Sequence, residues 1–169
     1  IAFNNNDIPG VMTANASRQY LNRYGVLTGK KIVITTNNDS VYQTALELQE
    51  AGSKVTILDS RKNINLELPK EIDVHLNTLP FSINGRKKIE GLDVCKATDK
   101  NNKNTIICDQ VLISGGWSPI VNLVSHRGIK PIWNQENLCF VPGDIKENIT
   151  VVGSAKGIWN KNDCVKSGL

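Results

Sequence analysis

Residues 30–59 place the tightest constraint on the fold of this chain, because they combine two buried strands with one intervening helix. Lys31–Thr36 is an apolar run rich in β-branched residues, which is typical of a strand buried on both faces. Residues 40–51 predict an amphipathic helix, and Gly52 can end it in the left-handed conformation. Residues 55–58 predict a second buried strand. A parallel pair joined by a helix is the βαβ unit of dinucleotide-binding folds.

The glycine fingerprint of a dinucleotide-binding turn is missing from this unit. The pattern G-x-G-x-x-G allows a tight turn, close approach of a pyrophosphate and close packing of helix on strand. Counted back from Gly52, its places fall on Thr36, Asn38 and Val41, whose side chains enter that space. Asp59 lies where an acidic group would bind a ribose hydroxyl. Asn38 and Asp59 therefore belong either to an atypical nucleotide site or to a retained fold that has lost its ligand.

The composition excludes several classes of protein. The 169 residues suit one domain or parts of two, and 40% hydrophobic with 21% charged residues is ordinary for a globular chain. The net charge is +4, but the lysines alternate with acids, so no basic face for nucleic acid is expected. No apolar run reaches the roughly 18 residues of a membrane span. The chain starts without methionine or a secretory signal, which predicts an excised segment of a cytoplasmic protein.

The cysteine pattern predicts neither a metal site nor a redox dithiol. The four cysteines are Cys95, Cys108, Cys139 and Cys164. They form no C-x-x-C pair and show no zinc-ligand spacing, and a reduced compartment is the default. If the polar turn at 99–103 centres between Asn101 and Asn102, Cys95 and Cys108 face each other on adjacent strands. Such a pair could form a disulfide in principle, but we expect two reduced thiols.

The middle of the chain predicts antiparallel structure. Residues 81–114 have the spacing of a β-meander, with Asn84-Gly85 as a hairpin signal. Residues 74–79 predict a strand before the meander, and residues 111–114 a buried strand at its end.

The last third of the chain predicts shorter elements. Residues 129–141 suit a hairpin, residues 149–152 a final buried strand and residues 160–167 a helix. Between that strand and helix lies the small-residue loop 153–157. Such a loop can be a place where a dinucleotide approaches backbone N–H groups, or simply a packing turn.

Three stretches together resemble one protein family. The first runs through residues 7–12 (DIPGVM) and continues through residues 17–26 (SRQYLNRYGV); the second is TNNDS at 36–40, and the third is SGGWSP at 114–119. They are similar to the alpha subunit of heterotetrameric sarcosine oxidases, in the middle of its N-terminal half. The similarity covers nearly the whole chain.

The resemblance implies an α/β architecture in two parts, like that of disulfide-reductase flavoproteins. Residues 1–26, which include a predicted helix ended by Gly25, would flank it as a helical segment of the first dinucleotide-binding domain. Residues 27–114 would form an inserted Rossmann-like domain, with a parallel sheet, a β-meander and the degenerate phosphate loop. Residues 115–169 would return to the first domain.

The resemblance also implies cofactors and partners. In that family the alpha subunit binds NAD and carries a folate-binding region, the beta subunit carries FAD, and FMN lies between them. The partners implied are the remainder of the alpha subunit and the beta and other subunits. The family's NAD-binding glycine motif is expected before residue 1, so no cofactor is expected on the isolated segment. The best candidates to contact NAD are Gly153, Ser154, Trp159 and Lys161.

Two functions from different classes remain. The first is a structural, NAD-site-forming domain of a complex that oxidatively demethylates sarcosine to glycine, with formaldehyde or methylene-tetrahydrofolate as the one-carbon product. Its catalytic residues would lie on the beta subunit. The alternative is a self-contained NAD(P)H- or FAD-dependent oxidoreductase with an atypical phosphate loop. No nucleophile–base pair supports the alternative, since His75 and His126 each stand alone.

Overall fold

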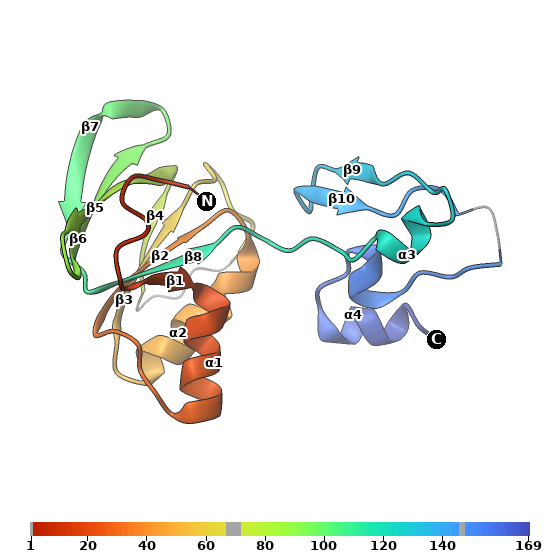
Figure 1. Cartoon of the computed structure of the whole chain (residues 1–169), viewed down its shortest axis with the longest axis horizontal. Helices are drawn as coiled ribbons and strands as arrows, with labels where there is room; N and C mark the ends of the chain where they lie inside the picture. The colour runs from red at the N-terminus through yellow and green to blue at the C-terminus, as the bar shows by residue number, and fades with distance from the viewer. Residues whose placement is uncertain (1, 67–71, 146–147) are drawn as a thin grey trace. The chain divides into compact units, whose positions relative to one another are not determined.

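The computed structural model describes residues 2–66, 72–145 and 148–169. The chain divides into two compact units, Ile1–Gly115 and Gly116–Leu169. The first unit holds a parallel and an antiparallel sheet with two helices, and the second holds a small hairpin with short helical turns (Figure 1).

A parallel sheet is the centre of the first unit. Its strands in spatial order are β1 (Val11–Thr13), β8 (Gln110–Ser114), β2 (Lys31–Thr36), β3 (Lys54–Asp59) and β4 (Asp73–Leu76). All four pairings are parallel, and the register of β2 on β3 runs from Lys31 opposite Lys54 to Thr36 opposite Asp59. The predicted α/β fold, with two buried strands in one parallel sheet, is confirmed.

Two helices cover one face of this sheet (Figure 1). They are α1 (Ala14–Tyr24) and α2 (Tyr42–Glu50), the second preceded by the 3-10 turn η1 (Asp39–Val41). Ala45 and Leu48 of α2 are fully buried against Ile34 and Ile57 of the sheet, as the apolar stripe of residues 40–51 predicts. Gly52, at φ +102°, lies just beyond the end of α2, as expected.

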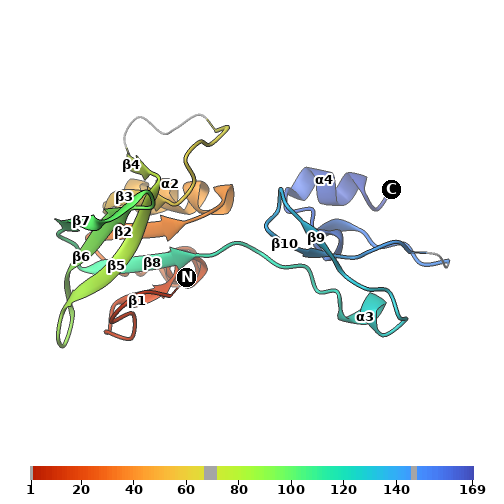
Figure 2. The same cartoon turned by 90° about the horizontal axis from the view of Figure 1, so that it is seen from above.

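The opposite face is covered by a three-stranded antiparallel sheet, which Figure 2 shows crossing the parallel strands. Its strands are β5 (Thr78–Gly85), β6 (Ile89–Lys96) and β7 (Asp99–Ile106), in that order. The predicted meander is therefore present, with its first turn one residue beyond Asn84-Gly85. The strand predicted at 111–114 leaves the meander and becomes β8 of the parallel sheet, because Val111 and Leu112 are buried on both faces.

The predicted facing of Cys95 and Cys108 is wrong. The hairpin closes early, with Lys96 opposite Asp99 next to a bulge, so Cys95 faces Lys103. Cys108 lies after β7, outside the hairpin. The polar run at 99–103 is an exposed edge strand rather than a turn, and polar composition alone does not distinguish the two. Both thiols are buried and free.

Residues 1–26 contribute to the first unit, because β1 pairs with β8 and α1 packs on the same core, and the division into residues 1–26, 27–114 and 115–169 stays a prediction. One further expectation differs from the structure. The strand predicted at 74–79 is divided at Asn77, whose φ of +54° turns the chain from β4 into β5.

The second unit contains a two-stranded hairpin and short helical segments. They are α3 (Asn122–Ser125), β9 (Ile132–Asn134), β10 (Cys139–Val141), η2 (Gly153–Lys156) and α4 (Lys161–Lys166). The hairpin within 129–141 and the helix within 160–167 are confirmed. The strand predicted at 149–152 is wrong: these residues are irregular, since among the described residues of this unit no strand pairs with them.

Candidate functional site

The carboxyl end of the parallel sheet is where a ligand is expected in this fold. The chain passes from β2 to β3 on one side, while β8 lies on the other side of β2, so the loops after β2 and β8 diverge there. Ligands of open α/β sheets bind at such a switch point. The Asn38 side chain donates from Nδ2 to the carbonyl of Ser114 at 3.4 Å and so links the two loops.

The loop after β2 satisfies its own polar groups. Thr36 is fully buried, and its Oγ1 accepts from the Asn38 N–H at 3.2 Å and donates to the Asn38 carbonyl at 3.0 Å. The Asn38 Oδ1 accepts from the Ser40 N–H at 3.1 Å and from the Ser40 hydroxyl. A phosphate would need such backbone donors free. Side chains of this loop therefore take the place that glycines leave open to a pyrophosphate.

Asp59 ends β3 and is fully buried. Its Oδ1 accepts from the backbone N–H and the Nε of Arg61, at 2.9 and 3.0 Å. Its Oδ2 accepts from Arg61 Nη2 at 2.7 Å and from the Tyr42 hydroxyl at 3.0 Å. Arg61 Nη2 also pairs with Asp39 at 2.7 Å. The carboxylate that could bind a ribose is thus held by a guanidinium and a phenol of the same chain.

The environment of this cluster keeps Tyr42 and Arg61 protonated, as donors to Asp59. Burial, and after it the charge of Asp59, raises the pKa of the Tyr42 hydroxyl well above its ordinary value, so the phenol stays protonated as a donor. The hydrogen bond to Asp59 is the main cause that raises the pKa of Arg61. Sequence analysis did not identify Tyr42 or Arg61. The pattern that could have identified Arg61 is an arginine two residues after an acidic residue at the end of a predicted strand.

The remaining candidates lie in the second unit, around η2 and the start of α4. Gly153 has φ +59° and donates its N–H to Ser167 Oγ at 2.8 Å. The Ser154 carbonyl accepts from the Gly157 N–H at 3.1 Å. Lys161 is the first residue of α4, and the Trp159 ring lies 6.4 Å from the ring of Trp117. Gly153, Ser154, Trp159 and Lys161 thus share one short segment, and their role toward NAD stays a prediction.

Two kinds of site are not seen in the described part of the chain. No group of three or more histidine, cysteine or acidic side chains there is arranged to hold a metal ion. None of the described helices has the length and apolar character needed to cross a bilayer.

Comparisons with known proteins give relatives by sequence and by fold. No family model matches the chain. It is 36% identical over 170 residues to sarcosine oxidase subunit alpha of Rhizobium meliloti (strain 1021), and 33% identical over 177 residues to that of Corynebacterium sp. (strain U-96). Each match covers 99% of this chain, which spans only 17% and 18% of the length of these two relatives.

The fold has a counterpart among solved structures. Thioredoxin reductase of Lactococcus lactis superposes with a TM-score of 0.64 at 20% identity, covering 94% of this chain and 54% of that one. At this identity the likeness shows the fold alone. The chain is therefore similar, along almost its whole length, to one segment of the sarcosine oxidase alpha subunits, and it carries that segment on an α/β fold of the thioredoxin reductase kind.

Proposed function

We propose that this chain is a structural, non-catalytic part of an oxidase alpha subunit and supplies one wall of the NAD site of that subunit. The parent complex would oxidatively demethylate sarcosine to glycine in the cytoplasm, with FAD and FMN as its further cofactors. The partners of the chain would be the remainder of the alpha subunit and the beta and other subunits. The similarity to two sarcosine oxidase alpha subunits supports this proposal.

The single observation that carries it is the occupied carboxyl end of the parallel sheet. The groups that a dinucleotide would use there are hydrogen-bonded within the chain: Asp59 to Arg61, and the backbone N–H groups of Asn38 and Ser40 to side chains of the same loop. To bind there, NAD would have to break these internal hydrogen bonds, and the hydrogen bonds it formed in their place would only be equivalent to them. The inserted fold therefore serves as a scaffold, and the NAD contacts fall to Gly153, Ser154, Trp159 and Lys161.

The isolated chain should bind NAD no better than at roughly millimolar Kd. Its four candidates form only one wall, whereas the ligand still loses its full translational and conformational freedom on binding. Isothermal calorimetry of the chain with NAD, NADH and FAD measures this. A micromolar Kd for any of the three would contradict the scaffold role and support a self-contained oxidoreductase.

The wall itself is tested in the full-length alpha subunit. Replacing Trp159 or Lys161 with alanine should raise the Kd for NAD about tenfold, a loss of one good contact at about 1.4 kcal/mol. Lys156→Ala is the matched control, since Lys156 is an exposed lysine of η2 that was not predicted to contact NAD. Unchanged affinity in both variants would remove this segment from the NAD site.

A further inference from the structure

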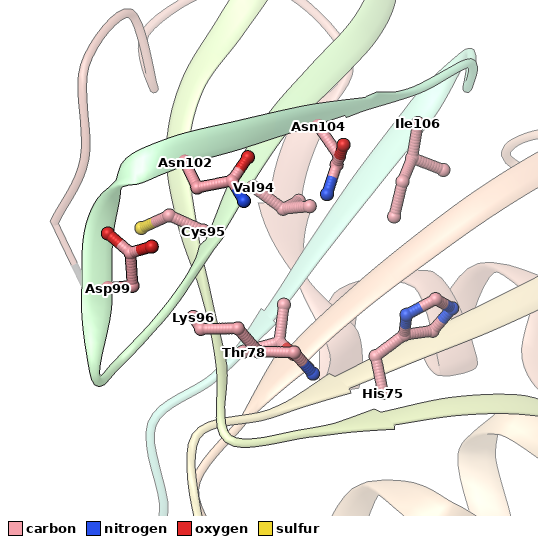
Figure 3. Close-up of a pocket in the computed structure, with 9 residues that line it drawn as sticks. All are labelled: His75, Thr78, Val94, Cys95, Lys96, Asp99, Asn102, Asn104 and Ile106. Carbon is pink, nitrogen blue, oxygen red and sulfur yellow. The ribbon is translucent and has the colours of Figure 1, made fainter.

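A pocket of about 280 Å³, open to solvent, lies at the surface of the first unit, between β4 and the hairpin of β6 and β7 (Figure 3). It is lined by His75, Thr78, Val94, Cys95, Lys96, Asp99, Asn102, Asn104 and Ile106. Its volume is near the lower limit of small-molecule sites, which begin at roughly 300 Å³. None of these residues belongs to the carboxyl end of β2 and β3 or to the proposed NAD wall, so the pocket is a separate feature.

The walls of the pocket include an apolar part. Val94 and Cys95 are buried on β6, and the Ile106 side chain hangs from β7 into the same space (Figure 3). A small apolar body would remove this surface from water, which favours its binding in proportion to the apolar area buried.

Lys96, an exposed residue at the end of β6, places an ammonium at this pocket, and Asp99 is its partner across the β6–β7 ladder. Its ammonium donates to the Leu76 carbonyl at 2.9 Å and to Thr78 Oγ1 at 3.1 Å, both of them neutral acceptors. Within the described residues, no carboxylate lies at ion-pair distance from its Nζ. An ammonium has three N–H donors, so one remains for a further acceptor.

Neutral donors face Lys96 from the other wall. The amide groups of Asn102 and Asn104 hang from β7 toward the pocket; both residues are exposed, and neither side chain has a hydrogen-bond partner within the described residues (Figure 3). His75 lies at one end, where its Nε2 meets Asp73 at 2.8 Å and its Nδ1 is left for another partner. Asp99 lies at the opposite end and accepts from the Asn101 N–H at 3.1 Å.

We propose that this pocket binds a small organic monocarboxylate with a compact apolar body. The carboxylate accepts from the Lys96 ammonium and from the amides of β7, and the body packs against Val94 and Ile106. An ammonium that forms no ion pair within 4 Å and keeps a free N–H favours an anion over a neutral molecule of the same shape. Asp99, which also lines the pocket, opposes negative charge, so a ligand with a single charge is favoured over one with two.

Benzoate is the probe for this proposal, with benzamide as its neutral isostere and inorganic phosphate as an anion without an apolar body. Binding to the chain is followed by ¹H–¹⁵N chemical-shift mapping. We expect benzoate to bind with a Kd of about 1 mM, to shift amides of β6 and β7, and to bind at least about tenfold more tightly than the other two. Equal binding of benzoate and benzamide, or of benzoate and phosphate, would overturn the proposal.

Charge variants make the test specific. Lys96→Met keeps the aliphatic stem and should weaken benzoate about tenfold, whereas Lys87→Met, at an exposed lysine of the turn between β5 and β6, should leave the Kd unchanged. Asp99→Asn should tighten benzoate about two- to fivefold by removing a like charge. If Lys96→Met fails to fold, Asp99→Asn decides: unchanged or weaker binding in that variant overturns the proposal, as does an absence of binding at about 20 mM benzoate.

Discussion

Arg61 holds the carboxylate of Asp59, the residue that the sequence predicts at the place of a ribose-binding acid. Its guanidinium donates twice to the buried carboxylate and once to Asp39, so its two acidic partners lie on different elements, the end of β3 and the start of η1. A guanidinium presents paired donors in a fixed plane, which matches the two oxygens of a carboxylate. The acceptor oxygens of Asp59 are therefore used by side chains and a backbone N–H of the same chain.

Arg61→Ala should lower the free energy of unfolding by about 3 kcal/mol. The substitution leaves the carboxylate of Asp59 buried without its cation, and removing one partner of a buried pair costs far more than the pair contributes. Urea unfolding followed by far-UV circular dichroism measures this change. Arg86→Ala, in the exposed turn after β5, is the matched control and should change the value by less than about 0.5 kcal/mol. A loss below 1 kcal/mol at Arg61 would contradict the buried pair.

At the scale of elements, a charged clamp joins the two helices beneath the sheet. Arg18 of α1 donates to both carboxylate oxygens of Glu47 on α2, at 2.6 and 2.7 Å, and Asn22 adds a third bond at 2.9 Å. The hydrogen bond from Arg18 is the main cause that lowers the pKa of Glu47 from 4.5 to about 2. The clamp therefore depends on pH.

The sign of this dependence follows from the lowered pKa. The contribution is present above the unfolded pKa of 4.5 and is lost as the pH falls toward 2. Glu47→Gln should be less stable than the parent chain by about 0.5 kcal/mol at pH 7, since the pair is partly solvated, and should match it near pH 2. Urea unfolding at both pH values tests this. Glu50→Gln, on the exposed side of α2, should show no such convergence; an equal effect there would refute the clamp.

At the scale of the whole molecule, the two units differ in the apolar core that stabilises them. The first buries two apolar clusters on either face of the parallel sheet. The second has a two-stranded hairpin, which is marginally stable alone, and exposes large apolar side chains such as Trp133 and Phe140. The tryptophans Trp117, Trp133 and Trp159, which are all three of the chain, lie in this second unit.

Tryptophan fluorescence should therefore change at a lower urea concentration than far-UV circular dichroism, which is dominated by the sheets and longer helices of the first unit. Non-coincident transitions are expected because the weaker unit opens first. Hydrogen exchange gives a second measurement, with amides of β2 and β8 protected longer than those of β9 and β10. Coincident transitions with equal protection would show that the two units unfold together.

Local patterns in the sequence were enough to predict part of this structure. The run Lys31–Thr36, the helix before Gly52 and the meander signal at Asn84-Gly85 each depend on neighbours a few residues apart. Such patterns reflect burial and turn geometry, which are local requirements. The absence of the three glycines and the acid at Asp59 were likewise visible in the sequence.

Tertiary structure alone decided the rest, because it depends on which distant segments meet. The pairing of β1 with β8 joins residues about a hundred positions apart, and no pattern in residues 11–13 predicts this pairing. Residues 149–152 are apolar enough for a strand, yet they find no neighbouring strand among the described residues of their unit. The hydrogen bond from the Tyr42 hydroxyl to Asp59 depends on how η1 and α2 pack beside β3, whereas Arg61 is a neighbour of Asp59 in the chain. The sequence by itself therefore determined the local elements, the absence of the glycine turn and the arginine beside the acid, whereas only long-range packing decided which strands pair and that the acid is buried against Tyr42.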